Sequence, residues 1–158
     1  LCTIQRDTTW PHERPAVTAS ESAFGPLMSD QTTDSDRDVR VVIVVPTYNE
    51  LQNVGALTEQ IFAAAPNVEI LFVDDGSPDG TAAWVQQHAE TNPRVHLLAR
   101  TSKDGLGRAY IAGFRWALQA SPRVTHIFQM DADLSHPPER VPALLRACLS
   151  GADLAIGS

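Results

Sequence analysis

Apolar residues fall into short continuous runs that alternate with segments of helical spacing along most of the chain. The continuous runs predict strands buried on both faces over residues 39–45, 68–73, 95–99, 124–130 and 153–157. Helical spacing predicts helices over 50–65, from the 74–80 loop to about 91, over 108–120 and over 141–149. The alternation predicts an α/β fold with right-handed βαβ units and a mainly parallel sheet.

Proline and asparagine mark the predicted ends of these elements. Pro46 is expected to end the first strand, and Asn49 to cap the helix that follows. The pair Pro137-Pro138 suits the start of the last helix. Pro142 is tolerable in that helix only within its first turn, which fixes where the helix begins.

The first 38 residues differ from the rest in composition. They hold seven acidic residues against three arginines and show no sustained helical or strand period. Such a segment has too little apolar surface to offset the entropy of ordering, so we expect a disordered acidic tail over 1–38 and one domain over 39–158. Because the chain begins with Leu1 and stops directly after a predicted strand, we expect Met28 as the natural start, or a fragment that is incomplete at its C-terminus.

Net charge and cysteine content narrow the function classes. The formal net charge of −7 argues against general binding of a nucleic-acid backbone, so we expect no nucleic-acid partner. No run of 18 apolar residues exists that could span a membrane as a helix. Cys2 and Cys148 suggest no disulfide framework, and a reducing compartment is the simpler interpretation.

Polar residues with candidate chemistry follow three of the predicted strands, in the loops 46–50, 74–80 and 131–138. In parallel sheets, ligands bind outside the carboxyl ends of the strands, where these loops meet. Asp131 and Asp133 repel each other unless a proton or a cation intervenes, and Mg²⁺ suits a few carboxylates combined with diphosphate oxygens. A solvated turn that caps the next helix is an equally weighted interpretation of this pair.

The two other loops offer groups for a nucleotide. Asp75 can accept hydrogen bonds from a ribose or a base edge. Tyr48 offers a flat face for base stacking, and Glu50 offers a carboxylate. The structural alternatives are a turn in which Asp79 caps the next helix, and a helix start with a packed tyrosine.

In combination, the motifs resemble those of family-2 glycosyltransferases, in particular the polyprenol (dolichol) phosphate mannosyltransferases. The resemblance covers residues 41–158, and its motifs are Pro46-Thr47-Tyr48-Asn49-Glu50, Asp74-Asp75-Gly76-Ser77-Pro78-Asp79-Gly80-Thr81, Gly105-Leu106-Gly107 and Asp131-Ala132-Asp133-Leu134-Ser135-His136-Pro137-Pro138. It implies a GT-A fold, a Rossmann-like sheet that binds a nucleotide sugar and a divalent metal.

The resemblance also implies roles for single residues. Pro46, Tyr48 and Glu50 would contact the guanine nucleotide, and Val73 and Asp75 would line the base and ribose site. Asp131 and Asp133 would bind Mg²⁺ or Mn²⁺ as the catalytic pair, with the Ala132 backbone beside the nucleotide.

The implied reaction transfers mannose from GDP-mannose to a polyprenyl phosphate at the cytoplasmic face of a membrane. Segments that hold the lipid phosphate and contact the membrane would follow Ser158. A phosphate monoester is already anionic at neutral pH, so it needs no general base. We therefore expect one displacement with inversion at the sugar.

Other functions compete with this one. Transfer of glucose or another sugar to a polyprenyl phosphate fits similar loops, and a non-catalytic nucleotide-binding module fits a truncated chain. A haloacid-dehalogenase-like phosphatase also uses an Asp-x-Asp pair, but after its first strand rather than its fourth. A dinucleotide oxidoreductase is disfavoured because no Gly-x-Gly-x-x-Gly follows the first strand.

Overall fold

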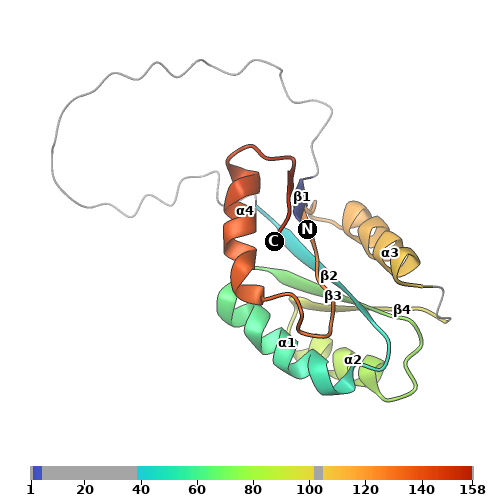
Figure 1. The fold of residues 1–158 in the computed structure, drawn as a ribbon. Helices are drawn as coiled ribbons and strands as arrows, with labels where there is room; N and C mark the ends of the chain where they lie inside the picture. The colour runs from blue at the N-terminus through green and yellow to red at the C-terminus, as the bar shows by residue number, and fades with distance from the viewer. Residues whose placement is uncertain (1, 5–38, 102–104, 158) are drawn as a thin grey trace, which may run out of the picture.

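The computed structural model describes residues 2–4, 39–101 and 105–157, which form a six-stranded sheet with helices on both faces (Figure 1). The order of strands across the sheet is β4-β3-β2-β5-β1-β6. The strands are β1 Cys2–Ile4, β2 Val41–Thr47, β3 Glu69–Asp74, β4 Val95–Ala99, β5 His126–Gln129 and β6 Leu154–Ala155. The helices are α1 Leu51–Ala64, α2 Thr81–Thr91, α3 Leu106–Gln119 and α4 Val141–Leu149, with a 3₁₀ turn at Pro138–Arg140 before α4.

Four neighbouring strands, β4, β3, β2 and β5, run parallel to one another. Every residue of β2 is buried, as expected for a strand with helices over both faces. The predicted α/β class and parallel sheet are confirmed. Pro142 lies in the first turn of α4, as predicted. The N–H groups of a first turn have no partner within the helix, so the missing N–H of proline removes no helical hydrogen bond there.

The predicted end of β2 was wrong. Pro46 does not end the strand, which continues to Thr47. The backbone groups of Val44 point toward β5, because its carbonyl accepts a hydrogen bond from the Met130 N–H. The backbone nitrogen of Pro46, two residues later, points to the same side. There β5 has already ended, and the missing N–H of proline costs the sheet no hydrogen bond.

Asn49 does not cap α1. It adopts a left-handed conformation with φ 61°, and Glu50 occupies the N-cap position without a side-chain cap. The Leu51 N–H instead donates to Asp79 Oδ2 from the next loop, at 3.1 Å. Asp79 Oδ1 also accepts the Thr81 N–H at the start of α2, as the sequence predicted. One carboxylate therefore serves the first turns of two helices.

The last strands of the sheet also differ from the prediction. Residues 1–38 were expected to contain no strand, but Cys2–Ile4 pairs antiparallel with both β5 and β6. Three residues are too few to show a period of two, so the sequence pattern gave no signal. The remainder of the predicted tail, residues 1 and 5–38, lies outside the described residues. The fifth predicted strand is present as β6, Leu154–Ala155, which pairs with β1.

Helix α3 covers one face of the sheet, and α1, α2 and α4 cover the other (Figure 1). The contact between α3 and the sheet is close at Gly113. A Cβ atom built there would lie 2.4 Å from Val44 Cγ1 and 3.2 Å from Val73 Cγ2. Both valines are fully buried in central strands, so they have little room to move. Glycine at this position sets the distance between the helix and the sheet.

Replacing Gly113 with alanine should therefore destabilise the protein. In an unhindered helix, alanine is favoured over glycine by about 1 kcal/mol, but overpacking of a core costs about 1–3 kcal/mol. We expect a net loss in the free energy of unfolding, measured by urea denaturation followed by circular dichroism. Gly107→Ala in the same helix is the control, because a Cβ there meets nothing within 4 Å. Equal stabilities of the two variants would contradict this packing argument.

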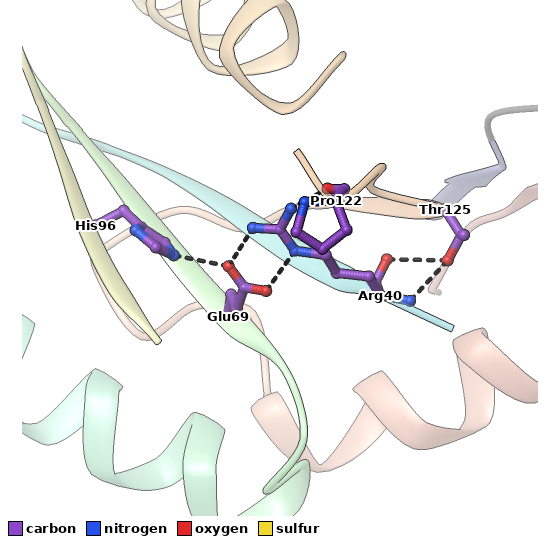
Figure 2. Close-up of polar contacts among 5 residues, drawn as sticks. All are labelled: Arg40, Glu69, His96, Pro122 and Thr125. Atoms are coloured by element: carbon purple, nitrogen blue, oxygen red, sulfur yellow. Dashed lines mark hydrogen bonds and ion pairs between the residues drawn. The ribbon is translucent and has the colours of Figure 1, made fainter. Parts of the chain in front are cut away.

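Polar side chains join the amino ends of the four parallel strands (Figure 2). Glu69 accepts two hydrogen bonds from Arg40, at 2.6 and 2.8 Å, and one from His96 Nε2 at 2.7 Å. The backbone of Arg40 exchanges hydrogen bonds with the Thr125 hydroxyl, and its guanidinium donates to the Pro122 carbonyl. The hydrogen bonds from Arg40, opposed by burial and aided by His96, hold the pKa of the Glu69 carboxyl below its usual value.

Candidate functional site

A pocket of about 290 Å³ lies at the carboxyl ends of the parallel strands. The loops after β2, β3 and β5 and the start of α3 meet there, as the rule for parallel sheets predicts. Its lining residues are Pro46, Thr47, Tyr48, Glu50, Asp75, Gly105, Leu106, Ala109, Asp131, Ala132 and Asp133.

The loop after β2 is tied to the loop after β3 by its backbone. The Asn49 N–H donates to Ser77 Oγ at 2.9 Å, and the Glu50 N–H donates to Thr81 Oγ1 at 3.0 Å. The Glu50 carboxylate accepts a hydrogen bond from Asn53 at 2.7 Å. Tyr48, directly before these two anchored residues, remains 37% exposed at the pocket. The loop thus presents an aromatic ring from a fixed backbone.

Asp74 organises the loop after β3 from a buried position. Its Oδ1 accepts hydrogen bonds from the hydroxyls of Thr47, at 3.0 Å, and Ser77, at 2.6 Å. Its Oδ2 accepts the backbone N–H groups of Gly76 and Ser77, at 3.1 and 2.9 Å. Asp74 is 1% exposed, so its role is to hold the turn. Gly76 adopts φ 76° in this turn, a conformation that favours glycine.

Asp75, the next residue, reaches the pocket and forms an ion pair with Arg100. Arg100 Nη1 donates to Asp75 Oδ1 at 2.6 Å, and both side chains are largely buried. A neighbouring cation compensates the charge of this carboxylate. Asp75 is therefore better suited to accept hydrogen bonds from a neutral ligand group than to bind a metal ion.

Asp131 and Asp133, after β5, have neutral hydrogen-bond donors instead. The Tyr110 hydroxyl donates to Asp131 Oδ1 at 2.6 Å, and the Ser135 N–H donates to Asp133 Oδ1 at 3.0 Å. The Asp131 N–H donates to His136 Nδ1 at 3.0 Å. The hydroxyl and backbone N–H of Ser135, followed by His136, hold the pKa of the Asp133 carboxyl below its usual value. Asp133 thus keeps its negative charge at the pocket.

This pair of carboxylates suits a divalent cation that takes most of its ligands from a substrate and from water. Oxygen ligands suit Mg²⁺ and Mn²⁺, and Mg²⁺ commonly binds through one or two carboxylates together with substrate phosphates. Within the part of the chain that the structure describes, no group of three or more His, Cys, Asp or Glu side chains could hold a metal. The remaining ligands would come from a diphosphate and water.

Seven of the eight residues predicted for the site line the pocket, namely Pro46, Tyr48, Glu50, Asp75, Asp131, Ala132 and Asp133. The structure does not bring the side chain of Val73 there, because it is fully buried against α3. Arg100 and Tyr110 were missed. Arg100 directly follows β4, so the strand-end rule could have found it, whereas no sequence signal pairs Tyr110 with Asp131.

Comparisons with known proteins show the family of this chain. Residues 42–158 match glycosyl transferase family 2, and the chain belongs to that family. The chain is 49% identical over 120 residues to an undecaprenyl-phosphate mannosyltransferase of Micrococcus luteus, covering 76% of this chain and 48% of that protein. It is 51% identical over 120 residues to a polyprenol monophosphomannose synthase of Mycolicibacterium smegmatis, covering 75% and 44%. The predicted resemblance is confirmed.

A dolichol-phosphate mannosyltransferase of Pyrococcus furiosus is 43% identical over 122 residues, covering 76% of this chain and 33% of that protein. The chain thus spans less than half the length of these curated relatives. None of the helices in the described ranges is both long enough and apolar enough to cross a membrane.

Solved structures support the fold. A mannosyltransferase of Pyrobaculum calidifontis, in complex with GDP-Man and Mn²⁺, superposes with a TM-score of 0.53 and 30% identity, covering 66% of this chain and 30% of that chain. TarS of S. aureus superposes with a TM-score of 0.56 and 17% identity, covering 71% and 32%, and supports the fold alone. The predicted GT-A fold is confirmed.

Proposed function

We propose that this chain is the donor-binding part of an inverting mannosyltransferase that uses GDP-mannose and a polyprenyl phosphate. The observation that carries the proposal is the convergence of three strand-end loops on one pocket. One side of that pocket holds an aromatic ring and a carboxylate paired with a guanidinium, and another holds two carboxylates whose hydrogen bonds come from a phenol and a backbone N–H. A nucleoside diphosphate needs these two environments together.

Tyr48, Glu50 and Asp75 would hold the nucleoside. The exposed ring of Tyr48 suits stacking on a base, which is a sequence-tolerant contact. Asp75 would accept hydrogen bonds from the base or the ribose, because Arg100 fixes one of its oxygens. Pro46 and the Ala132 backbone would complete the walls. Val73 would support the pocket indirectly, because its buried side chain packs between the sheet and α3.

Asp131 and Asp133 would hold Mg²⁺ or Mn²⁺ against the diphosphate. A bound divalent ion would neutralise the negative charge that develops on the departing GDP. The mannosyltransferase of Pyrobaculum calidifontis binds both GDP-Man and Mn²⁺, which supports this division of roles. The two aspartates are the proposed catalytic pair.

The acceptor needs no general base from the protein. A phosphate monoester is anionic at neutral pH, so it can attack the sugar directly, with inversion. Segments after Ser158 would hold its phosphate and contact the membrane at the cytoplasmic face. The names of the relatives support this acceptor class, since they act on undecaprenyl, polyprenol and dolichol phosphates.

Titration calorimetry of this chain tests the donor assignment. We expect GDP-mannose to bind more tightly in Mg²⁺ or Mn²⁺ than in EDTA, because the metal offsets repulsion between the diphosphate and the two aspartates. Equal affinities would overturn the metal role. Tighter binding of UDP-glucose than of GDP-mannose would favour a glucosyl donor. Binding by a chain extended past Ser158, without sugar transfer to a polyprenyl phosphate, would favour a non-catalytic nucleotide-binding module.

A further inference from the structure

Tyr110 lies on α3, one residue after Ala109, which lines the pocket. Its ring is partly buried and packs on the ring of Phe114 one turn later, with centroids 6.1 Å apart and an interplanar angle of 29°. This packing restricts the ring, because a residue four positions along a helix lies on the same face. The Tyr110 hydroxyl therefore has a defined position at the edge of the pocket.

That hydroxyl donates a hydrogen bond to Asp131 Oδ1 at 2.6 Å. A phenol has an ordinary pKa of about 10, so this hydroxyl is neutral at physiological pH and serves as a donor. Asp131 Oδ2 accepts no hydrogen bond from the described residues, and His136 Nδ1 lies 3.8 Å from it.

The choice of a neutral donor matters for a cation site. Asp75 in the same pocket is paired with a guanidinium, which cancels most of its charge. A phenol orients a carboxylate through a single bond and leaves its negative charge in place. The Asp131 side chain is 37% exposed and follows the strand in a loop, so without this bond several rotamers would be open to it.

We propose that Tyr110 is a positioning residue that holds the Asp131 carboxylate in the orientation that binds the divalent ion. This inference rests on the proposed function, in which Asp131 and Asp133 bind that ion. Groups that orient metal ligands through hydrogen bonds typically change metal affinity by roughly 10- to 100-fold when removed. Tyr110→Phe removes the hydroxyl and keeps the ring that packs on Phe114.

The test is a titration of Mn²⁺ in the presence of saturating GDP, with free Mn²⁺ measured by electron paramagnetic resonance. We expect Tyr110→Phe to bind Mn²⁺ roughly 10-fold more weakly or worse, with unchanged GDP affinity in EDTA. Phe114→Leu is the matched control, because it disturbs the same packing but keeps the hydroxyl. Its Mn²⁺ affinity should stay within about 3-fold of the wild type. A merely structural role would instead give both variants similar losses.

Two outcomes separate this inference from the proposed function. If the wild-type chain binds no Mn²⁺ with GDP, the metal role of Asp131 fails, and the role of Tyr110 fails with it. If the wild type binds Mn²⁺ and Tyr110→Phe binds it equally well, only the role of Tyr110 is overturned.

A measurement on the wild type covers the case of a poorly folded variant. Selective labelling of aspartate with ¹³C should show the Asp131 Cγ resonance move when Mg²⁺ is added with GDP, while the Tyr110 hydroxyl proton stays protected from exchange. Loss of that protection on Mg²⁺ addition would show that the contact is absent from the metal-bound state, and would overturn the inference.

Discussion

Replacing Asp131 and Asp133 together with asparagine should weaken metal-dependent binding of GDP-mannose about 100-fold, or by about 2.7 kcal/mol. The amides keep the volume of the carboxylates but remove both negative charges, so the divalent ion loses its protein anchor. Calorimetry in Mg²⁺ and in EDTA measures the effect. In EDTA the double variant should bind GDP-mannose at least as well as the wild type, because two charges that repel the diphosphate are gone.

The control is Glu139→Gln, in the 3₁₀ turn that follows the same loop. This exposed carboxylate does not line the pocket, so its replacement changes the net charge without touching the site. We expect unchanged binding in both conditions. A comparable loss in Glu139→Gln would mean that general electrostatics, rather than two metal ligands, determine the affinity.

Replacing Asp74 with asparagine should be the most destabilising isosteric change near the pocket. Each carboxylate oxygen accepts two donors: hydroxyls at Oδ1 and backbone N–H groups at Oδ2. In one orientation the amide nitrogen of asparagine would face two backbone N–H donors, and in the other the two hydroxyls would have to reorient and accept from it. Hydrogen bonds to charged groups contribute about 1.5–3 kcal/mol each, and a buried unsatisfied group costs about 1–3 kcal/mol.

We expect a loss of roughly 3–5 kcal/mol in the free energy of unfolding, measured by urea denaturation. Donor binding should weaken as well, because Asp75 and the turn at Gly76 depend on this anchor. Glu90→Gln, an exposed residue of α2, removes the same charge without these contacts and should leave stability within about 0.5 kcal/mol. A loss below about 1 kcal/mol for Asp74→Asn would show that the loop tolerates a rearranged turn.

The sequence was sufficient to predict the parts of the fold that depend on local pattern. Continuous apolar runs gave the four parallel strands, and the run over 95–99 matches β4 residue by residue. Prediction from the sequence failed where a residue has its hydrogen-bond partner in a distant segment of the chain. Asn49 looked like a helix cap, but the cap is Asp79, which is 28 residues from the N–H group of Leu51. Pro46 looked like a strand end because the early end of β5 is not visible in the sequence of β2.

The contrast between local pattern and distant partners also applies to the residues of the site. Asp131, Asp133 and Asp75 were found because strand ends converge in every parallel sheet, and polar residues there stand out. The difference between these acids could not be predicted. It depends on whether the neighbour is a guanidinium or a phenol, and both neighbours come from other elements: Arg100 is 25 residues from Asp75, and Tyr110 is 21 residues from Asp131.

The polar network at the amino ends of the strands has a consequence for how the strands align. The runs Val41–Val45 and Ile70–Val73 are buried at every position, so their side chains give little preference for one alignment over its neighbour. Glu69 lies opposite Val42, two residues after Arg40, and His96 lies opposite Leu71, two residues after Glu69. The three side chains of the network therefore share one face of the sheet.

A slip of β3 by one residue would turn Glu69 to the opposite face, away from both Arg40 and His96. That alignment would leave a carboxylate and a guanidinium without their partners, at a cost that the uniform apolar runs could not offset. Misaligned pairings are thus penalised at the end of the sheet farthest from the pocket. The residues that select the correct strand pairing are separate from those that bind the ligand, so either set can change in sequence while the other is retained.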